Sequence, residues 1–188
     1  QFARFFAEHL SNRLGQPFLV EPTPGASGNI GVSKFLTKPA DGYTVFVGTS
    51  ATNAANYSLF NNLPYKESDF APVACLYQLP PVVAVRSSLP VKSIAELAAY
   101  AKANPGKMTY GWGSTTSKVG GELFKARTGT DILGVPYKGS PQVMTDMLGG
   151  RIDMTVESAV VVLPHAEAGT MRILAVTSMS RLDSLPNV

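Results

Sequence analysis

Residues 110–124, YGWGSTTSKVGGELF, are the stretch that decides the fold. They predict a short apolar strand, a loop of glycine and hydroxyl residues, and the first turns of a helix. At such a junction several backbone N–H groups and the positive end of the helix dipole point at one place, where an anion can bind. No nucleophile with a neighbouring base occurs in it. The stretch therefore predicts a binding loop for a small carboxylate or phosphate.

The same order of strand, loop and helix recurs through the second part of the chain. We expect helices at residues 93–103, 114–128, 140–148 and 160–168, and strands at residues 82–85, 108–111, 132–135, 152–156 and 172–177. Ser93 and Glu96 have the spacing of a capping box, and Gly129 is placed to end a helix. Ser140 stands before a proline, as an N-cap does. Repeated units of this length predict an α/β protein with a parallel or mostly parallel sheet.

The first part of the chain predicts a less regular arrangement. We expect an amphipathic helix at residues 2–14, a second helix at residues 29–36, and strands at residues 18–21, 43–47 and 73–77. The run 43–47 is apolar throughout, which is typical of a strand buried on both faces. Because Gln1 leads straight into the first helix, and the last residues close no element, we expect polypeptide to be missing at both ends.

Sheets of this kind bind ligands beyond the carboxyl ends of their strands. The loops in that place are residues 49–53, 111–118, 137–140 and 157–159. Pro80 and Pro81 cannot continue a central strand, which suggests that the chain passes from one lobe to another at this point. We expect residues 1–79 to form part of a first lobe, residues 80–175 a second lobe, and residues 176–188 a return towards the first.

The candidate ligand-binding residues lie in these loops, and several have a structural alternative. They are Thr49, Ser50, Asn53, Trp112, Ser114, Thr115, Thr116, Ser117, Lys118, Tyr137 and Glu157. Trp112 could line a pocket or fill a core. Lys118 is in the first turns of a helix, where a cation is unfavourable, so it indicates an anionic ligand. Tyr137 could contact a ligand or belong to a loop that only caps a helix, and Glu157 could bind a ligand or simply be solvated.

Composition and motifs exclude several classes of protein. The chain has 188 residues, 45% of them hydrophobic, and a net charge of +3 from scattered basic residues, so it is globular and shows no nucleic-acid footprint. The lone Cys75 excludes an internal disulfide and a cysteine metal site. No Gly-x-Ser-x-Gly, dinucleotide or P-loop motif occurs. Neither His9 nor His165 lies at the end of a strand, where a catalytic base would be useful. From these observations together we predict no catalytic residue, no metal and no cofactor.

Seven segments in order along the chain resemble the extracytoplasmic solute-binding receptors of tripartite tricarboxylate transporters, the Bug proteins. The segments are EPTPGASGNIG (21–31), PADGYT (39–44), DFAPV (69–73), YAKANPGK (100–107), GELF (121–124), VPYKGS (135–140) and LAVTS (174–178). They cover nearly the whole chain, and together they are specific for this family.

The resemblance implies a type II periplasmic binding fold, in which two lobes close around a ligand like a Venus flytrap. It further implies a periplasmic, monomeric receptor that binds a mono-, di- or tricarboxylate or an aromatic acid and delivers it to membrane permease subunits. The matching positions are Thr49, Ser50, Asn53, Ser114, Thr115, Thr116, Ser117, Tyr137 and Glu157. The chain departs from the family at Lys118, where a histidine is usual. The family's signal peptide, first strand and Pro-Gly-Gly loop would precede Gln1, which leaves the first lobe incomplete.

Two other classes remain open. A hydrolase or lyase could use Glu157 or Tyr137 as a general acid or base in the same cleft. A structural or regulatory domain could retain the fold without binding a ligand.

Overall fold

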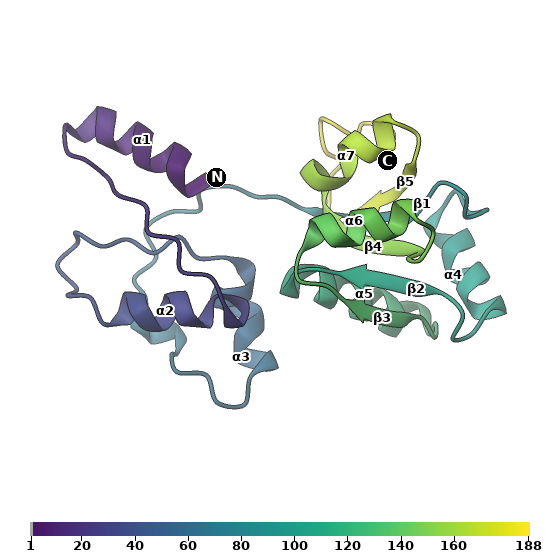
Figure 1. Cartoon of the computed structure of the whole chain (residues 1–188), viewed down its shortest axis with the longest axis horizontal. Coiled ribbons are helices and arrows are strands. Elements are labelled where there is room, and N and C mark those ends of the chain that lie inside the picture. The colour runs from purple at the N-terminus through teal and green to yellow at the C-terminus, as the bar shows by residue number, and fades with distance from the viewer. Residues whose placement is uncertain (1) are drawn as a thin grey trace. The chain divides into compact units, whose positions relative to one another are not determined.

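The computed structural model describes residues 2–188. These residues form two compact units, the first ending at Val73 and the second being Ala74–Val188. Figure 1 shows helices α1, α2 and α3 in the first unit and a sheet flanked by helices in the second. The last residues belong to the second unit, where Leu182 and Leu185 pack against its core.

The sheet of the second unit has five strands in the order β3-β2-β4-β1-β5. Their bounds are Pro81–Arg86 (β1), Thr109–Trp112 (β2), Leu133–Pro136 (β3), Met154–Ser158 (β4) and Met171–Val176 (β5). Strand β2 is parallel to β3 and β4, whereas β1 is antiparallel to β4 and β5. Four strands therefore run in one direction and β1 in the other. The predicted α/β class is confirmed with a mixed sheet, in which two of the four strand pairings are antiparallel.

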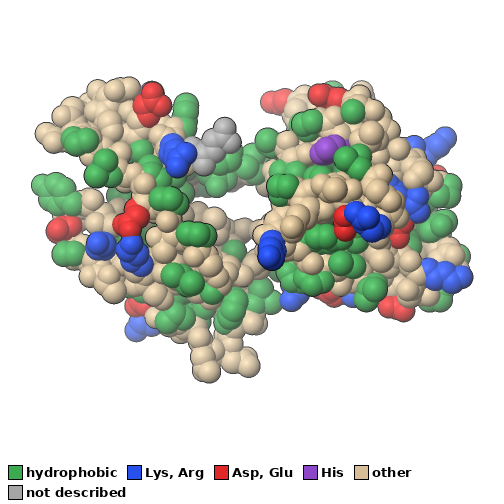
Figure 2. Space-filling model, in the orientation of Figure 1, with side chains coloured by type: hydrophobic (Ala, Val, Ile, Leu, Met, Phe, Trp, Pro, Cys, Tyr) green, Lys and Arg blue, Asp and Glu red, His purple; other side chains and the backbone are tan. Residues whose placement is uncertain are grey.

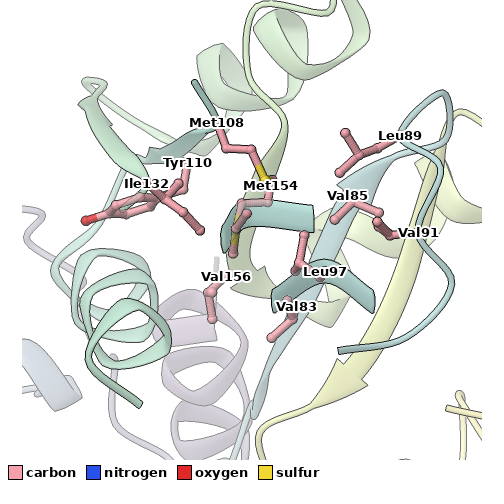
Figure 3. Packing of buried hydrophobic residues seen from close by; sticks show 11 residues of the cluster. Val83, Val85, Leu89, Val91, Leu97, Met108, Tyr110, Ile132, Met154 and Val156 are labelled. Atoms are coloured by element: carbon pink, nitrogen blue, oxygen red, sulfur yellow. The ribbon is translucent and has the colours of Figure 1, made fainter. Parts of the chain in front are cut away.

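Helices cover both faces of this sheet (Figure 1). Their bounds are Ile94–Ala103 (α4), Thr115–Thr128 (α5), Ser140–Leu148 (α6) and Ala159–Glu167 (α7). Val83 and Val85 of β1 pack with α4, α5 and the core seen in Figure 3, where side chains of β2 and β4 also meet. Val82 and Ala84 pack with α6 and α7. This alternation follows from the two-residue period of a strand, which places successive side chains on opposite faces.

Close contacts at glycine hold α5 against the sheet. A Cβ atom at Gly121 would lie 2.3 Å from the Tyr110 ring, and one at Gly134 would lie 2.8 Å from it. The ring therefore lies between α5 and β3, and its hydroxyl donates to Glu122 Oε1 at 2.5 Å. Burial first, and then this hydrogen bond, raises the pKa of Tyr110.

Helix α4 begins differently from its prediction. The Ser93 hydroxyl accepts the Glu96 N–H at 3.2 Å, as predicted, but the Glu96 carboxylate accepts the Lys92 N–H rather than that of Ser93. The predicted reciprocal capping box is therefore wrong.

Two further helix ends were also predicted. The N-cap of α6 is Gly139 and not Ser140, because the Ser140 hydroxyl is bound to Glu157 instead. The left-handed stop at Gly129 is confirmed by its φ of 62°.

The first unit contains three α-helices among its described residues, and the strands predicted before Pro80 are wrong. The helices are Phe2–Leu14 (α1), Asn29–Leu36 (α2) and Asn56–Leu59 (α3). None of the runs 18–21, 43–47 and 73–77 pairs with another strand anywhere in residues 2–188. A strand persists when a neighbour satisfies its backbone N–H and C=O groups and covers its side chains. Leu19 is 94% exposed and Tyr43 93% exposed, so neither condition is met.

Aromatic rings and a buried polar network form the core of the first unit. The Phe35 ring stacks on those of Phe46 and Phe70, with centroids 5.4 and 6.2 Å away. The Asn56 amide donates to Asn29 Oδ1 at 2.7 Å, and the Tyr65 hydroxyl donates to the same oxygen at 2.9 Å. These bonds join α2 and α3 to the turn that follows them.

Candidate ligand-binding site

The carboxyl ends of β2, β3 and β4 lie at one edge of the sheet, because these strands are parallel neighbours. Trp112 is paired with Pro136, and Gly111 with Thr155. Each strand leads within a few residues into a helix, α5, α6 or α7. The N-terminal ends of these three helices therefore lie at the same edge. The positive ends of three helix dipoles favour an anion there.

Serines 114 and 117 fix the start of α5. The Ser114 hydroxyl accepts the Ser117 N–H at 3.2 Å, and the Ser117 hydroxyl accepts the Ser114 N–H at 3.0 Å. This closed capping box engages both hydroxyls within the protein, and Ser117 is buried. Thr115 and Thr116 are the first two residues of the helix, so four predicted site residues lie together here.

The loop after β2 touches the loop after β3. A Cβ atom at Gly113 would lie 2.3 Å from the carbonyl carbon of Gly139 and 2.5 Å from the nitrogen of Ser140. The Tyr137 N–H also donates to the Trp112 carbonyl at 2.9 Å. Glycine at 113 is therefore what brings the N-terminal ends of α5 and α6 close together.

Glu157 connects β4 to the N-terminal end of α6. Its carboxylate accepts the Ser140 hydroxyl at 2.6 Å and the Ser158 N–H at 3.0 Å, and the residue is only 7% exposed. The negative charge lies where the dipoles of α6 and α7 favour it. Sequence reasoning named both Glu157 and Ser140 but gave no sign that they bind one another.

The Tyr137 hydroxyl is bound to α6. It donates to Asp146 Oδ2 at 2.7 Å, and Asp146 also accepts from Arg151 at 2.5 Å. Burial, and then the hydrogen bond and charge of Asp146, raise the pKa of Tyr137 to about 12. The bonds to Arg151 and then Tyr137 lower the pKa of Asp146. Tyr137 and Asp146 line a shallow pocket of about 270 Å³ with Gln142 and Thr145.

Lys118 lies over the ring of Trp112, with its ammonium 5.0 Å from the ring centroid. Both residues are half-buried, and Trp112 ends β2. Within residues 2–188 no carboxylate oxygen lies within 4 Å of this ammonium. The sequence alone did not decide whether Trp112 lines a pocket or fills a core. The structure gives the ring partial contact with the core and a cation on its face.

Three predicted site residues lie in the first unit, around a buried threonine. The Thr52 hydroxyl accepts the Thr49 N–H at 2.9 Å and donates to Asn53 Oδ1 at 2.7 Å. Ser50 lies between Thr49 and Thr52, as the N-cap of a short π-helix at Ala51–Ala55. Thr52 itself is 3% exposed and was not predicted, although a threonine three residues after Thr49 is a recurrent local hydrogen-bonding pattern.

Charge and metal-binding groups do not mark another site in the part of the chain that the structure describes. On the face shown in Figure 2, basic and acidic side chains are interspersed over both units. The described residues contain no cluster of three His, Cys, Asp or Glu side chains that could hold a metal. No helix among them has the length and apolar character needed to cross a bilayer.

Solved structures define the class of protein. The structure described as "R. palustris Rpa4515 with adipate" matches with a TM-score of 0.88 and 38% identity, over 99% of this chain and 63% of that chain. MatC from Rhodopseudomonas palustris with bound malate matches with a TM-score of 0.85 and 26% identity, over 100% of this chain and 65% of that chain. The fold is therefore that of two-lobed α/β periplasmic binding proteins, which confirms the predicted fold class.

The family follows from the sequence comparison. Residues 2–188 match the tripartite tricarboxylate transporter family receptor, and the chain belongs to this family. Protein BugT of Bordetella pertussis is 36% identical over 99% of this chain and 58% of that protein. The family resemblance is thus confirmed. The chain spans little more than half the length, 56% and 58%, of two curated relatives.

Proposed function

We propose that this chain belongs to a receptor that binds a small organic acid at the carboxyl edge of the second unit's sheet. The observation that carries the proposal is the position of three helix N-terminal ends at that edge. Hydrogen bonds to a charged partner contribute roughly 1.5–3 kcal/mol each. A few such bonds from backbone N–H groups are sufficient for a receptor of moderate affinity.

A carboxylate suits this edge better than a phosphate or nucleotide. The loops contain no Gly-Lys-Ser/Thr or dinucleotide fingerprint, and short hydroxyl side chains flank the helix starts. Two structures of similar fold are described with adipate and with malate, which are both carboxylates. We extend the family's role to this chain and propose periplasmic capture of the acid and its delivery to membrane permease subunits.

An enzymatic function is less well supported. A general acid or base needs an accessible group whose pKa lies near the working pH. Glu157 is buried and already accepts two hydrogen bonds, whereas the pKa of Tyr137 is raised to about 12. The family is one of receptors. Binding without turnover is therefore the function that we propose.

Thr116→Glu tests the proposed site. Thr116 is exposed in the first turn of α5, where an acidic residue favours the helix but repels an anionic ligand. We expect calorimetry with a panel of carboxylates to find a ligand for the wild type and Thr116→Glu to weaken its binding at least about tenfold.

Ala95→Glu is the matched control. It places the same charge at the equivalent exposed position of α4, which follows the antiparallel strand β1 and begins away from the proposed edge. Its affinity should equal that of the wild type. A wild type that binds no carboxylate, or equal affinity for Thr116→Glu and wild type, would contradict the proposal.

A further inference from the structure

We propose that Lys118 makes this site select acids with two carboxylates over acids with one. The inference rests on the proposed function, because it concerns the ligand of the same edge. Beyond the proposed function, it specifies how many carboxylates the ligand carries and which residue binds the second one.

The position of Lys118 follows from helix geometry. It is the fourth residue of α5, and side chains on a helix point back towards its N-terminal end. The ammonium accordingly lies over Trp112, the last residue of β2, beside the loop that leads into the helix. It is therefore a cation at the mouth of the proposed anion site.

Lys118 makes no short-range ion pair with a carboxylate in residues 2–188. Glu122, one turn further along α5, accepts from Tyr110 at 2.5 Å and pairs with Lys125 at 3.2 Å. Glu157 is held by Ser140 and Ser158. Neither carboxylate lies within 4 Å of the Lys118 ammonium, and no other does in residues 2–188. The hydrogen bond from Tyr110 is the main cause that lowers the pKa of Glu122, and the charge of Lys118 adds to it at longer range. A cation without a close ion-pair partner at the positive end of a helix is unfavourable until an anion arrives.

The ring of Trp112 positions the Lys118 ammonium. An ammonium over an indole ring is attracted to its negative face, so the lysine stays at the edge rather than extending into solvent. The exposed part of the ring offers an apolar surface to a hydrocarbon chain. A ligand with one carboxylate at the helix ends and a second at Lys118 would satisfy both positive regions, whereas a monocarboxylate would satisfy only one.

Lys138 is the matched comparison. It lies in the loop between β3 and α6 at the same edge, but it is exposed, and the lysines that lie over aromatic rings in residues 2–188 are Lys118 and Lys125. An exposed ammonium is screened by water and salt. Its charge should therefore contribute little to the choice of ligand.

Adipate and hexanoate provide the test, because they have the same number of carbons and differ in one carboxylate. In calorimetric titrations of the 188-residue chain, we expect adipate to bind at least about tenfold more tightly than hexanoate. Lys118→Met should remove this preference by weakening adipate alone, with hexanoate changed less than about twofold. Lys118→Arg should retain the preference, and Lys138→Met should behave as the wild type. Circular dichroism verifies that each variant is folded.

The outcomes separate this inference from the proposed function. Equal affinity of the wild type for the two acids would overturn the role of Lys118 and leave a carboxylate receptor. An equal loss for both acids in Lys118→Met would also overturn it, since the lysine would then be a general contact. If the wild type binds neither acid, the proposed function fails for these probes and the selectivity inference fails with it.

Discussion

The second unit encloses a five-stranded sheet between two pairs of helices, whereas the described residues of the first unit, 2–73, contain no paired strand. Both contain apolar runs suited to a strand. Val82 in β1 is fully buried between β4 and β5, but Tyr43 in the first unit is 93% exposed. The difference shows that apolar character and β propensity make a segment able to form a strand. Whether the strand forms depends on a neighbouring strand for its hydrogen bonds and on a layer that covers its side chains.

Replacing one leucine by alanine in each unit should give the largest difference in stability between the two units. Leu97 is fully buried between α4 and the sheet, so Leu97→Ala should lower the free energy of unfolding by about 2–5 kcal/mol. Leu19 is 94% exposed, and Leu19→Ala should change it by less than about 0.5 kcal/mol. Urea unfolding followed by far-UV circular dichroism reports on both units, whereas the fluorescence of Trp112, the one tryptophan of the chain, reports on the second unit alone. A comparable loss in both variants would break the comparison.

The contact between the loops at Gly113 gives a second test. Gly113→Ala places a Cβ atom 2.3 Å from the backbone of Gly139, so the loops must separate, at a cost of about 1–3 kcal/mol. Gly139→Ala is the control from the other side of the contact, because its new Cβ atom meets only Pro141, at 3.7 Å. Urea midpoints should fall for Gly113→Ala alone. Similar midpoints for the two variants would mean that the junction is not tightly packed.

The capping box of α5 should have a smaller effect. Ser114→Ala removes the acceptor of the Ser117 N–H and should lower the stability of the second unit by about 1 kcal/mol. Ser114→Thr keeps an oxygen at the N-cap and should restore most of it. Fluorescence-detected unfolding of the three proteins measures this, and an unaffected Ser114→Ala would show that the cap is not needed.

The smallest effect concerns Tyr137 at high pH. Its pKa is raised from 10.0 to about 12, so its protonated form stabilises the folded state fully below pH 10 and loses that contribution between about pH 10 and pH 12. Tyr137→Phe should cost about 0.5–1 kcal/mol near neutral pH through the lost hydrogen bond to Asp146. The gap between wild type and variant should narrow as the pH rises above 10. A gap in urea midpoints that is independent of pH would contradict the assignment.

The sequence predicted the second unit well because its signals are local. Helix α6 at Ser140–Leu148, α5 ending before Gly129 and the strands of the sheet all follow from periodicity and capping residues. The direction of β1 could not be predicted in this way. Whether a strand is parallel to its neighbours depends on the order in which distant segments are placed side by side.

The candidate site was predicted as a set of loops but not as a set of contacts. The loops after β2, β3 and β4 do meet at one edge, as expected of strands that run in parallel. The partners of Glu157 and Tyr137 are Ser140 and Asp146, which only the packed helix α6 brings into reach. Which of the named residues touch a ligand stays a prediction, including Thr49, Ser50 and Asn53 of the first unit.

The reversed strand β1, between β4 and the edge strand β5, has a consequence for the order in which the chain can fold. Val83 of β1 lies between Val156 of β4 and Ala175 of β5, so the earliest strand of the sheet has the two latest strands as its neighbours. During synthesis, β2, α5 and β3 can assemble from nearby residues, but β1 lacks one flank until Met171–Val176 has emerged. Until then its apolar sequence PVVAVR keeps an open edge to which another chain can add. The antiparallel part of this sheet, formed by β4, β1 and β5, is therefore the last part of it that a ribosome completes.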